Sequence, residues 1–352
     1  MQNLFNIINI PLSWVLKQLA NIFGGNFAAA VFVFTLLINI ALIPLSIKSQ
    51  KSSVQQTRIK PKLDDLKKRC GDDRQKYNEG MQRLYQEEGV SMSGGCLPMI
   101  LRLVLMMSIY WLIMSPLTYM AGVDKSNINT VNTAITESMT ELEKKDKEKF
   151  EYYSEKINWS KNNSRNELGI VNIVRGDDEI LKELLSEKEY KKIKGDLEAI
   201  RQKDSESNIS YSLFTDKLNL TESPKFSFDI FHDAELIWLM PIIAFLAQML
   251  SSVLSMRMQK KLNPDAPSMS GMMLTMPLIS LFIGFSFPGG VTFYWACSSL
   301  IGGFIQLGVQ NFYGPHKMLS RERCKELLKQ CDFEAGQIKK LTSDKDDVIK
   351  ED

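Results

Sequence analysis

The sequence predicts an all-α membrane protein whose chain crosses the bilayer five times. About 20 helical residues are needed to cross the ~30 Å hydrocarbon core of a bilayer. Three apolar runs have about this length, 27–45, 96–120 and 236–256. A fourth apolar region, 271–312, is about twice as long and is interrupted at Pro288-Gly289-Gly290, so it predicts a hairpin of two spans.

The distribution of charge predicts the orientation, although 43 Lys and Arg nearly balance 41 Asp and Glu. Loop 48–95 holds eleven basic against seven acidic residues, whereas 121–234 holds 18 basic against 23 acidic residues. The positive-inside rule then puts the N-terminus outside and the C-terminus in the cytoplasm of a multi-pass plasma-membrane protein, a parity that five spans satisfy. The predicted segments are an N-terminal interfacial helix (1–25), TM1 (26–47), a cytoplasmic helical hairpin (48–95), TM2 (96–120), an extracytoplasmic insertion (121–234), TM3 (235–256), a cytoplasmic loop (257–270), TM4 (271–287), TM5 (289–313) and a cytoplasmic tail (314–352).

Residues 11–23 are predicted to form a helix that lies along the membrane surface, starting near Pro11. Its apolar face would consist of Leu12, Val15, Leu16, Leu19, Ile22 and Phe23. The alternative is a packed N-terminal helix that extends the first span.

The inner loop is predicted to be a helical hairpin of 52–70 and 74–88, separated by the helix stop and N-cap candidates Gly71-Asp72-Asp73. Basic residues near anionic lipid contribute roughly 1 kcal/mol each, so this hairpin is also a candidate surface platform. Its candidate contact residues are Lys60, Lys67, Lys68 and Arg69. Simple packing of the two arms on each other is the alternative reading.

The outer insertion is expected to be helical, with a charged helix over 140–156 and an amphipathic helix over 178–202. Nothing in it indicates a chemical activity. The mixed-charge tail after about Lys339 is expected to lack fixed structure.

Arg102 is the most informative residue, because it lies inside the predicted second span. Its guanidinium keeps its charge, and insertion scales put the cost at the helix centre at about 2.5–3.5 kcal/mol. Asn39 and Gln248 lie at a similar depth, roughly 10 Å inside the inner boundary at about 1.5 Å per residue. The three residues predict a polar surface open to the cytoplasm. Snorkelling of Arg102 is the alternative, but Asn39 is too short to follow it and needs partners.

The sequence lacks nucleotide-binding, serine-elbow and zinc-protease motifs. The chain has two histidines and five cysteines without metal-ligand spacing. We therefore expect no enzymatic activity, no cofactor, no metal site and no direct DNA binding. The apolar regions are rich in methionine, which suits contact with varied apolar segments or serves as ordinary lipid-facing filler.

Three segments carry a family resemblance by their order, spacing and topology. They are TLLINIALIPLSIKSQKSS, YNEGMQRLYQEEGVSMSGGCLPMIL and MMLTMPLISLFIGFSFPGGVTFYWACSSLIGGFIQ. Together with their flanks they resemble the YidC/Oxa/Alb family of membrane protein insertases over 1–120 and 235–315. The five-span, N-out plan is similar to the Gram-positive branch of that family.

The resemblance implies a hydrophilic groove, open to the cytoplasm and lipid and closed to the outside. A basic residue in the groove attracts acidic outer segments of nascent membrane proteins, whose apolar spans then slide into the bilayer without ATP. The Sec translocon and the ribosome are further candidate partners. The candidate groove residues are Arg102, Asn39, Gln248 and Trp295, and the candidates for the groove or sliding face are Met106, Tyr294 and Gln306.

The chain departs from the family pattern in two places. The groove's basic residue usually lies in the first span, where this chain has Asn39, and Arg102 occupies a position that is glutamine in many members. We predict that the charge has moved to the neighbouring helix and that Asn39 and Arg102 face each other. The second departure is the long insertion 121–234. The rival readings are a small-solute transporter or channel, and a membrane-anchored scaffold that acts through 121–234; five non-repeating spans without acidic residues argue against ion coupling.

Overall fold

The computed structural model describes residues 2–71, 73–89, 97–157, 159, 166–176, 179–213, 215–224, 235–262 and 270–348. The chain divides into two compact units. Unit 1 comprises Met1–Ala41, Ile100–Met256 and Pro267–Phe304, and unit 2 comprises Leu42–Met99, Arg257–Ala266 and Ile305–Asp352. The regular elements of the described residues are helices apart from one short β-hairpin, in agreement with the predicted all-α class.

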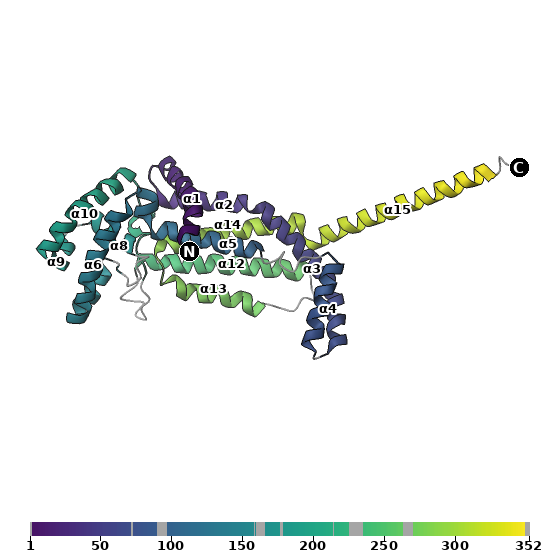
Figure 1. Ribbon diagram of the computed structural model, residues 1–352, viewed down its shortest axis with the longest axis horizontal. Coiled ribbons are helices and arrows are strands. Elements are labelled where there is room, and N and C mark those ends of the chain that lie inside the picture. The colour runs from purple at the N-terminus through teal and green to yellow at the C-terminus, as the bar shows by residue number, and fades with distance from the viewer. Residues whose placement is uncertain are drawn as a thin grey trace. The chain divides into compact units, whose positions relative to one another are not determined.

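The apolar helices run along a common direction (Figure 1). They are α2 (Phe27–Ala41), α5 (Leu97–Met114), α12 (Leu239–Leu262), α13 (Ser270–Gly284) and α14 (Gly289–Tyr313). Among the described residues, Leu236–Met258 alone forms one unbroken helix that is long and apolar enough to cross a membrane. Two further apolar helices, Leu103–Met114 and Thr275–Gly284, are shorter. One span is therefore clear, and the other four stay predictions.

A break divides the predicted first span. Helix α2 ends at Ala41, and α3 (Ile43–Cys70) begins directly after Leu42. Pro44 lies in the first turn of α3, where its missing N–H leaves no intrahelical bond unmade, whereas inside a longer helix it would remove one. The two pieces Phe27–Ala41 and Ile43–Ser52 qualify as a span only if they are counted together as one broken helix.

The N-terminal helix α1 (Gln2–Ile22) begins before the predicted 11–23, and most of its predicted apolar face packs against the protein. Leu16 and Ala20 are fully buried, and the side chains predicted to face lipid at positions 12, 15 and 19 also pack against the protein core. The helix contacts α2 and the short π-helix η1 (Leu117–Ala121). An apolar stripe on the opposite side is exposed: Ile7, Ile10, Trp14 and Ile22. The packed alternative therefore describes most of the predicted apolar face.

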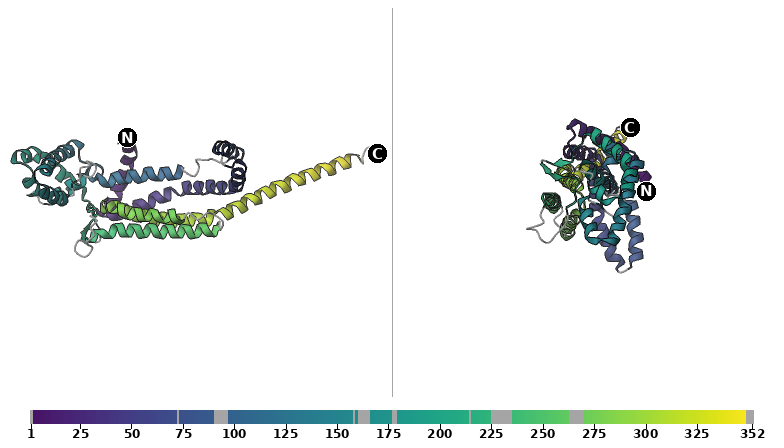
Figure 2. Two further views of the ribbon diagram at one scale, coloured as in Figure 1. Left: turned by 90° about the horizontal axis from the view of Figure 1, so that it is seen from below. Right: turned by 90° about the vertical axis from the view of Figure 1, so that its left-hand side faces the viewer.

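The helices of the outer insertion gather into one cluster (Figure 2). They are α6 (Lys125–Lys145), α7 (Lys147–Lys156), α8 (Asn166–Arg175), α9 (Glu179–Leu184) and α10 (Glu187–Ser207). Both helices predicted here are interrupted by capping residues. Asp146 caps α7 by accepting a hydrogen bond from the Lys149 amide, and Ser186 and Glu189 form a capping box that starts α10. The cluster has an apolar core that includes Val131, Ile135, Leu181, Ile193, Leu197 and Ile200.

The insertion also contains a β-hairpin of β1 (Ser212–Leu213) and β2 (Thr215–Asn219), which was not predicted. The extended segment around it is hydrogen-bonded to the first turns of two apolar helices. The Ser210 amide donates to the Gly25 carbonyl over 2.8 Å, and the Gly290 amide donates to the Leu220 carbonyl over 2.8 Å. A Cβ at Gly25 would lie 1.9 Å from the Asn208 carbonyl oxygen, so this approach requires glycine.

Unit 2 contains the predicted helical hairpin and the tail. Gly71 ends α3 with φ +53°, and Asp73 caps α4 (Arg74–Glu87) by accepting from the Lys76 amide over 3.0 Å. The two arms pack directly, because a Cβ at Gly80 would meet the Leu66 side chain at 2.9 Å. The tail forms helix α15 (Pro315–Val348). The helix continues past Lys339, where the sequence predicted that fixed structure would end.

Candidate functional site

Asn39 lies on the buried face of α2, together with Phe34 and Thr35. Only 7% of its surface is exposed. Its Nδ2 donates to the Thr35 carbonyl one turn earlier over 2.8 Å, so its own helix supplies one of the partners that a buried amide needs. The Thr35 hydroxyl donates to the Val31 carbonyl in the same way.

The Asn39 amide oxygen faces α14. A Cβ built at Gly302 would lie 3.2 Å from Asn39 Oδ1, which is tighter than ordinary van der Waals contact. Nearby, a Cβ at Gly303 would lie 2.7 Å from the Ser251 hydroxyl of α12. The adjacent glycines therefore let α14 approach α2 and α12 closely, as small residues do between membrane helices.

This contact gives a prediction for Gly302. We expect Gly302→Val to destabilise the protein by about 1–3 kcal/mol, because overpacking forces Asn39 or the backbone to move. Gly308→Val on the same helix is the matched control, since nothing lies within 4 Å of a Cβ there. Thermal unfolding in detergent measures the difference. In an Asn39→Ala background, Gly302→Val should destabilise the protein less. An equal destabilisation would show that the new side chain does not clash with Asn39.

Gln248 joins two helices of unit 1. Its Oε1 accepts a hydrogen bond from the Ser280 hydroxyl of α13 over 2.6 Å, and Ser280 also donates to the Pro277 carbonyl. Sequence reasoning selected Gln248 but missed Ser280, because a serine in an apolar run is too common to identify its distant partner. Among the described contacts, Gln248 and Asn39 are each bonded to a different partner and not to each other.

The aromatic candidates lie beside each other in α14 but have different surroundings. Tyr294 is 7% exposed and belongs to the main apolar core. Trp295 is partly buried, stacks edge-on with Phe287 at 5.4 Å, and packs against a small alanine cluster that includes Ala244 and Ala247. Met106 is partly buried against the main core, and Gln306 in unit 2 is partly buried.

The backbone of Arg102 lies in α5, and its side chain lies outside the described residues. Its position on the helix can still be read from its neighbours. At about 100° per residue, position 102 shares a face with Met106 and Ile109, of which Ile109 is 1% exposed. Ile100 and Leu103, on the other side, are 53% and 55% exposed. By this spacing, position 102 lies on the same face of α5 as Ile109.

The basic candidates of the inner hairpin lie in α3. Lys67, Lys68 and Arg69 are exposed in its last turn, where positive charge also stabilises the helix dipole. The side chain of Lys60 lies outside the described residues.

A carboxylate that sequence reasoning missed joins α8 to η1. Glu167 accepts hydrogen bonds from the Thr118 amide over 3.0 Å and from the Thr118 hydroxyl over 2.7 Å. Burial raises the pKa of the Glu167 carboxyl above its ordinary value, although the bonds from Thr118 oppose the shift. The two residues are 49 positions apart, so no local pattern connects them.

The raised pKa of Glu167 predicts the sign of a pH effect. The stabilising contribution of this group is complete below the unfolded pKa of about 4.5 and is lost as the pH rises through the folded value. We expect Glu167→Gln, which stays neutral and can still accept from Thr118, to raise the melting temperature at neutral pH and to flatten its decline above pH 4.5. Melting curves from pH 4 to about 8 test this. Glu189→Gln is the control and should lower the melting temperature at neutral pH, because hydrogen bonds from Ser186 lower the pKa of Glu189.

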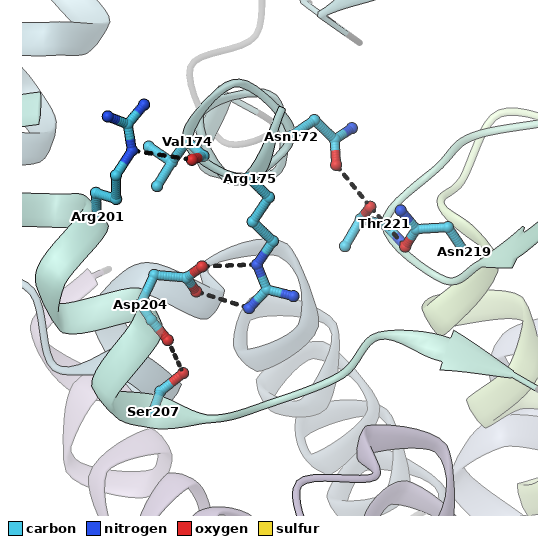
Figure 3. A network of polar contacts seen from close by, with 8 residues as sticks. All are labelled: Asn172, Val174, Arg175, Arg201, Asp204, Ser207, Asn219 and Thr221. Atoms are coloured by element: carbon cyan, nitrogen blue, oxygen red, sulfur yellow. Dashed lines mark hydrogen bonds and ion pairs between the residues drawn. The ribbon is translucent and has the colours of Figure 1, made fainter. Parts of the chain in front are cut away.

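A second polar network ties α8 to α10 (Figure 3). Arg175 Nε donates to Asp204 Oδ2 over 2.6 Å, and Nη2 donates to Oδ1 over 2.8 Å. The guanidinium also lies 4.7 Å from the ring centroid of Tyr211. Next to it, the Thr221 hydroxyl donates to Asn172 over 2.9 Å, which attaches the segment after the β-hairpin to α8. These contacts hold the insertion together.

One long apolar helix that could cross a membrane, together with further apolar helices, is typical of helical integral membrane proteins. Residues 18–316 match the family described as "60Kd inner membrane protein". The chain belongs to this family, which is the YidC/Oxa/Alb family that the sequence resembles.

Two relatives, both described as "Membrane protein insertase YidC", illustrate the extent of the similarity. The protein of Alkalilimnicola ehrlichii is 36% identical over 104 residues, which is 30% of this chain and 18% of the relative. The protein of Shewanella baltica is 38% identical over 105 residues, which is 30% of this chain and 19% of the relative. The aligned region thus spans about a fifth of each relative's own length.

Proposed function

We propose that this chain is a membrane protein insertase. It moves segments of nascent membrane proteins from the cytoplasm into the lipid bilayer without ATP. Membership in the family supports this function, as do the relatives described as insertases. The mechanism makes and breaks no covalent bond, so it requires no catalytic residue and no cofactor.

The observation that carries the proposal is a permanent cation, Arg102, within the apolar helix α5. By its spacing Arg102 shares a helical face with the buried Ile109, and the apolar runs 27–45, 96–120, 236–256 and 271–312 contain no Asp or Glu to neutralise it. A charge in this position needs water, amides or a visiting anion. In the proposed groove the visiting anion is an acidic outer segment of the substrate, and Asn39, Gln248 and Trp295 contribute the groove's polar and aromatic lining.

The proposed topology has five spans, with the N-terminus outside and the C-terminus in the cytoplasm. The insertion 121–234 then lies outside and the hairpin 48–95 inside. On the cytoplasmic side the basic residues of α3 meet anionic lipid, each contributing roughly 1 kcal/mol, and present a surface to the ribosome or the Sec translocon. The exposure of Lys67, Lys68 and Arg69 supports this assignment.

An insertion assay with purified protein tests the function. Proteoliposomes without ATP receive a single-span substrate with an acidic outer tail, and protection of the tail from added protease is measured. The proposal expects protection to depend on the protein. Protection equal to that of empty liposomes would refute it.

The two rival functions are separated by further measurements. A protein-dependent ion flux in the same vesicles would favour a transporter or channel. Exchanging the apolar helices for an unrelated anchor tests the scaffold, because a scaffold would keep its cellular function after the exchange and an insertase would lose it.

A further inference from the structure

Helix α15 exposes apolar side chains along much of its length. Leu327, Leu328, Phe333 and Ile338 are 58%, 59%, 67% and 62% exposed. Within unit 2 it contacts α3. Helices owe most of their stability in water to packing of an apolar face. Of these four residues, Leu328 and Ile338 share one face of this 34-residue helix, and that face suits contact with a partner.

The apolar residues of α15 include a heptad pattern. Cys324, Leu328, Cys331, Ala335 and Ile338 follow one another at intervals of four, three, four and three residues. This spacing keeps them on one seam of a left-handed coiled coil, with Leu328 and Ala335 at a positions and the two cysteines and Ile338 at d positions. We propose that α15 pairs in parallel with α15 of a second copy of this chain.

Charge complementarity favours a second copy as the partner. In this register Glu334 occupies a g position and Lys339 the following e position, five residues later. In a parallel pair these positions lie opposite each other on the two chains, so two copies place Glu334 against Lys339 twice. The other g positions, Ser320, Leu327 and Leu341, add no like-charge pair.

The composition of the helix argues against the membrane surface as the partner. An interfacial helix concentrates basic residues on its polar face, whereas α15 carries acidic residues among its basic ones in both halves, including Glu322, Glu326, Asp332 and Glu334. The seam is short, but anchoring both copies in one membrane raises their effective concentration, so a weak seam is sufficient.

Cysteine cross-linking in membranes tests the pairing with the full chain. A variant that keeps only Cys331 is compared with a variant whose single cysteine comes from Phe333→Cys, two residues further on at an f position facing away from the seam. Copper phenanthroline serves as the oxidant that removes two electrons and two protons from each thiol pair. We expect the Cys331 variant to form disulfide-linked dimers roughly tenfold faster or more, because a residue on a twofold seam meets its own copy.

Charge reversal supplies the second measurement. Glu334→Lys should slow cross-linking through Cys331, and adding Lys339→Glu should restore it. Equal cross-linking by the two cysteine variants, or no rescue by the double reversal, would overturn the proposal. Burial of Leu328 and Ile338 by added anionic vesicles, with no cross-linked dimer, would also overturn the proposal. That result would assign the seam to lipid.

Discussion

Replacing Arg102 with alanine is expected to reduce insertion of substrates with acidic outer tails by roughly 10- to 100-fold. Hydrogen bonds to charged groups contribute about 1.5–3 kcal/mol, and each 1.4 kcal/mol corresponds to about tenfold in an equilibrium constant. We expect a loss of this size because the predicted spans hold no second basic residue that could replace Arg102. The initial rate of tail protection in proteoliposomes measures it.

Two comparisons make the Arg102 result specific. Arg102→Lys retains the positive charge and should retain most of the activity. Insertion of a substrate with a neutral tail should be nearly unchanged by Arg102→Ala, because attraction of the tail is the step that depends on charge. A variant that inserts both substrates as well as the wild type would refute the charge-attraction role of Arg102.

The second large effect is expected at the Arg175–Asp204 pair of the outer insertion. Breaking a fully buried ion pair by removing one partner costs about 3–5 kcal/mol. The Arg175 side chain is 33% exposed and Asp204 5%, so water screens part of this cost and we expect about 2–3 kcal/mol for Asp204→Ala. The melting temperature of the purified protein should fall by several degrees.

The control for Asp204 lies on the same helix. Glu198→Ala removes an exposed ion pair with Lys194, in which both side chains are more than half exposed. Such pairs contribute about 0.3–0.5 kcal/mol, so its effect should be small. The double variant Arg175→Met/Asp204→Leu should recover much of the loss, because it leaves no unpaired buried charge. Equal melting temperatures for Asp204→Ala and Glu198→Ala would contradict the structural role of the pair.

Local patterns predicted several elements correctly. The uninterrupted apolar run of α12 indicated the clear span, and Gly71 with Asp73 marked the turn between α3 and α4. Local signals also mark the breaks that the structure adds to the predicted helices. Pro44 marks the break in the first span, and the Ser186–Glu189 capping box interrupts an otherwise continuous amphipathic pattern.

Other features could not be read from the sequence, because they depend on contacts between distant segments. Periodicity identified one apolar face on α1 but could not decide whether it packs against the protein or lies on the membrane. The hydrogen-bond partners could not be predicted either, because Gln248 and Ser280 are 32 residues apart and Arg175 and Asp204 are 29 apart. For the candidate groove, sequence chemistry selected Arg102, Asn39 and Gln248, and the structure added the neighbours Gly302 and Ser280.

The most direct test of the proposed function is site-specific photo-cross-linking from position 102 to a ribosome-stalled nascent chain with an acidic outer tail. The matched positions are Ile100 and Leu103, which lie on the exposed face of the same helix. If Arg102 lines the groove, the photoreactive residue at position 102 captures the nascent chain more strongly than the same residue at positions 100 and 103. Capture from positions 100 and 103 alone would contradict an inward-facing groove charge.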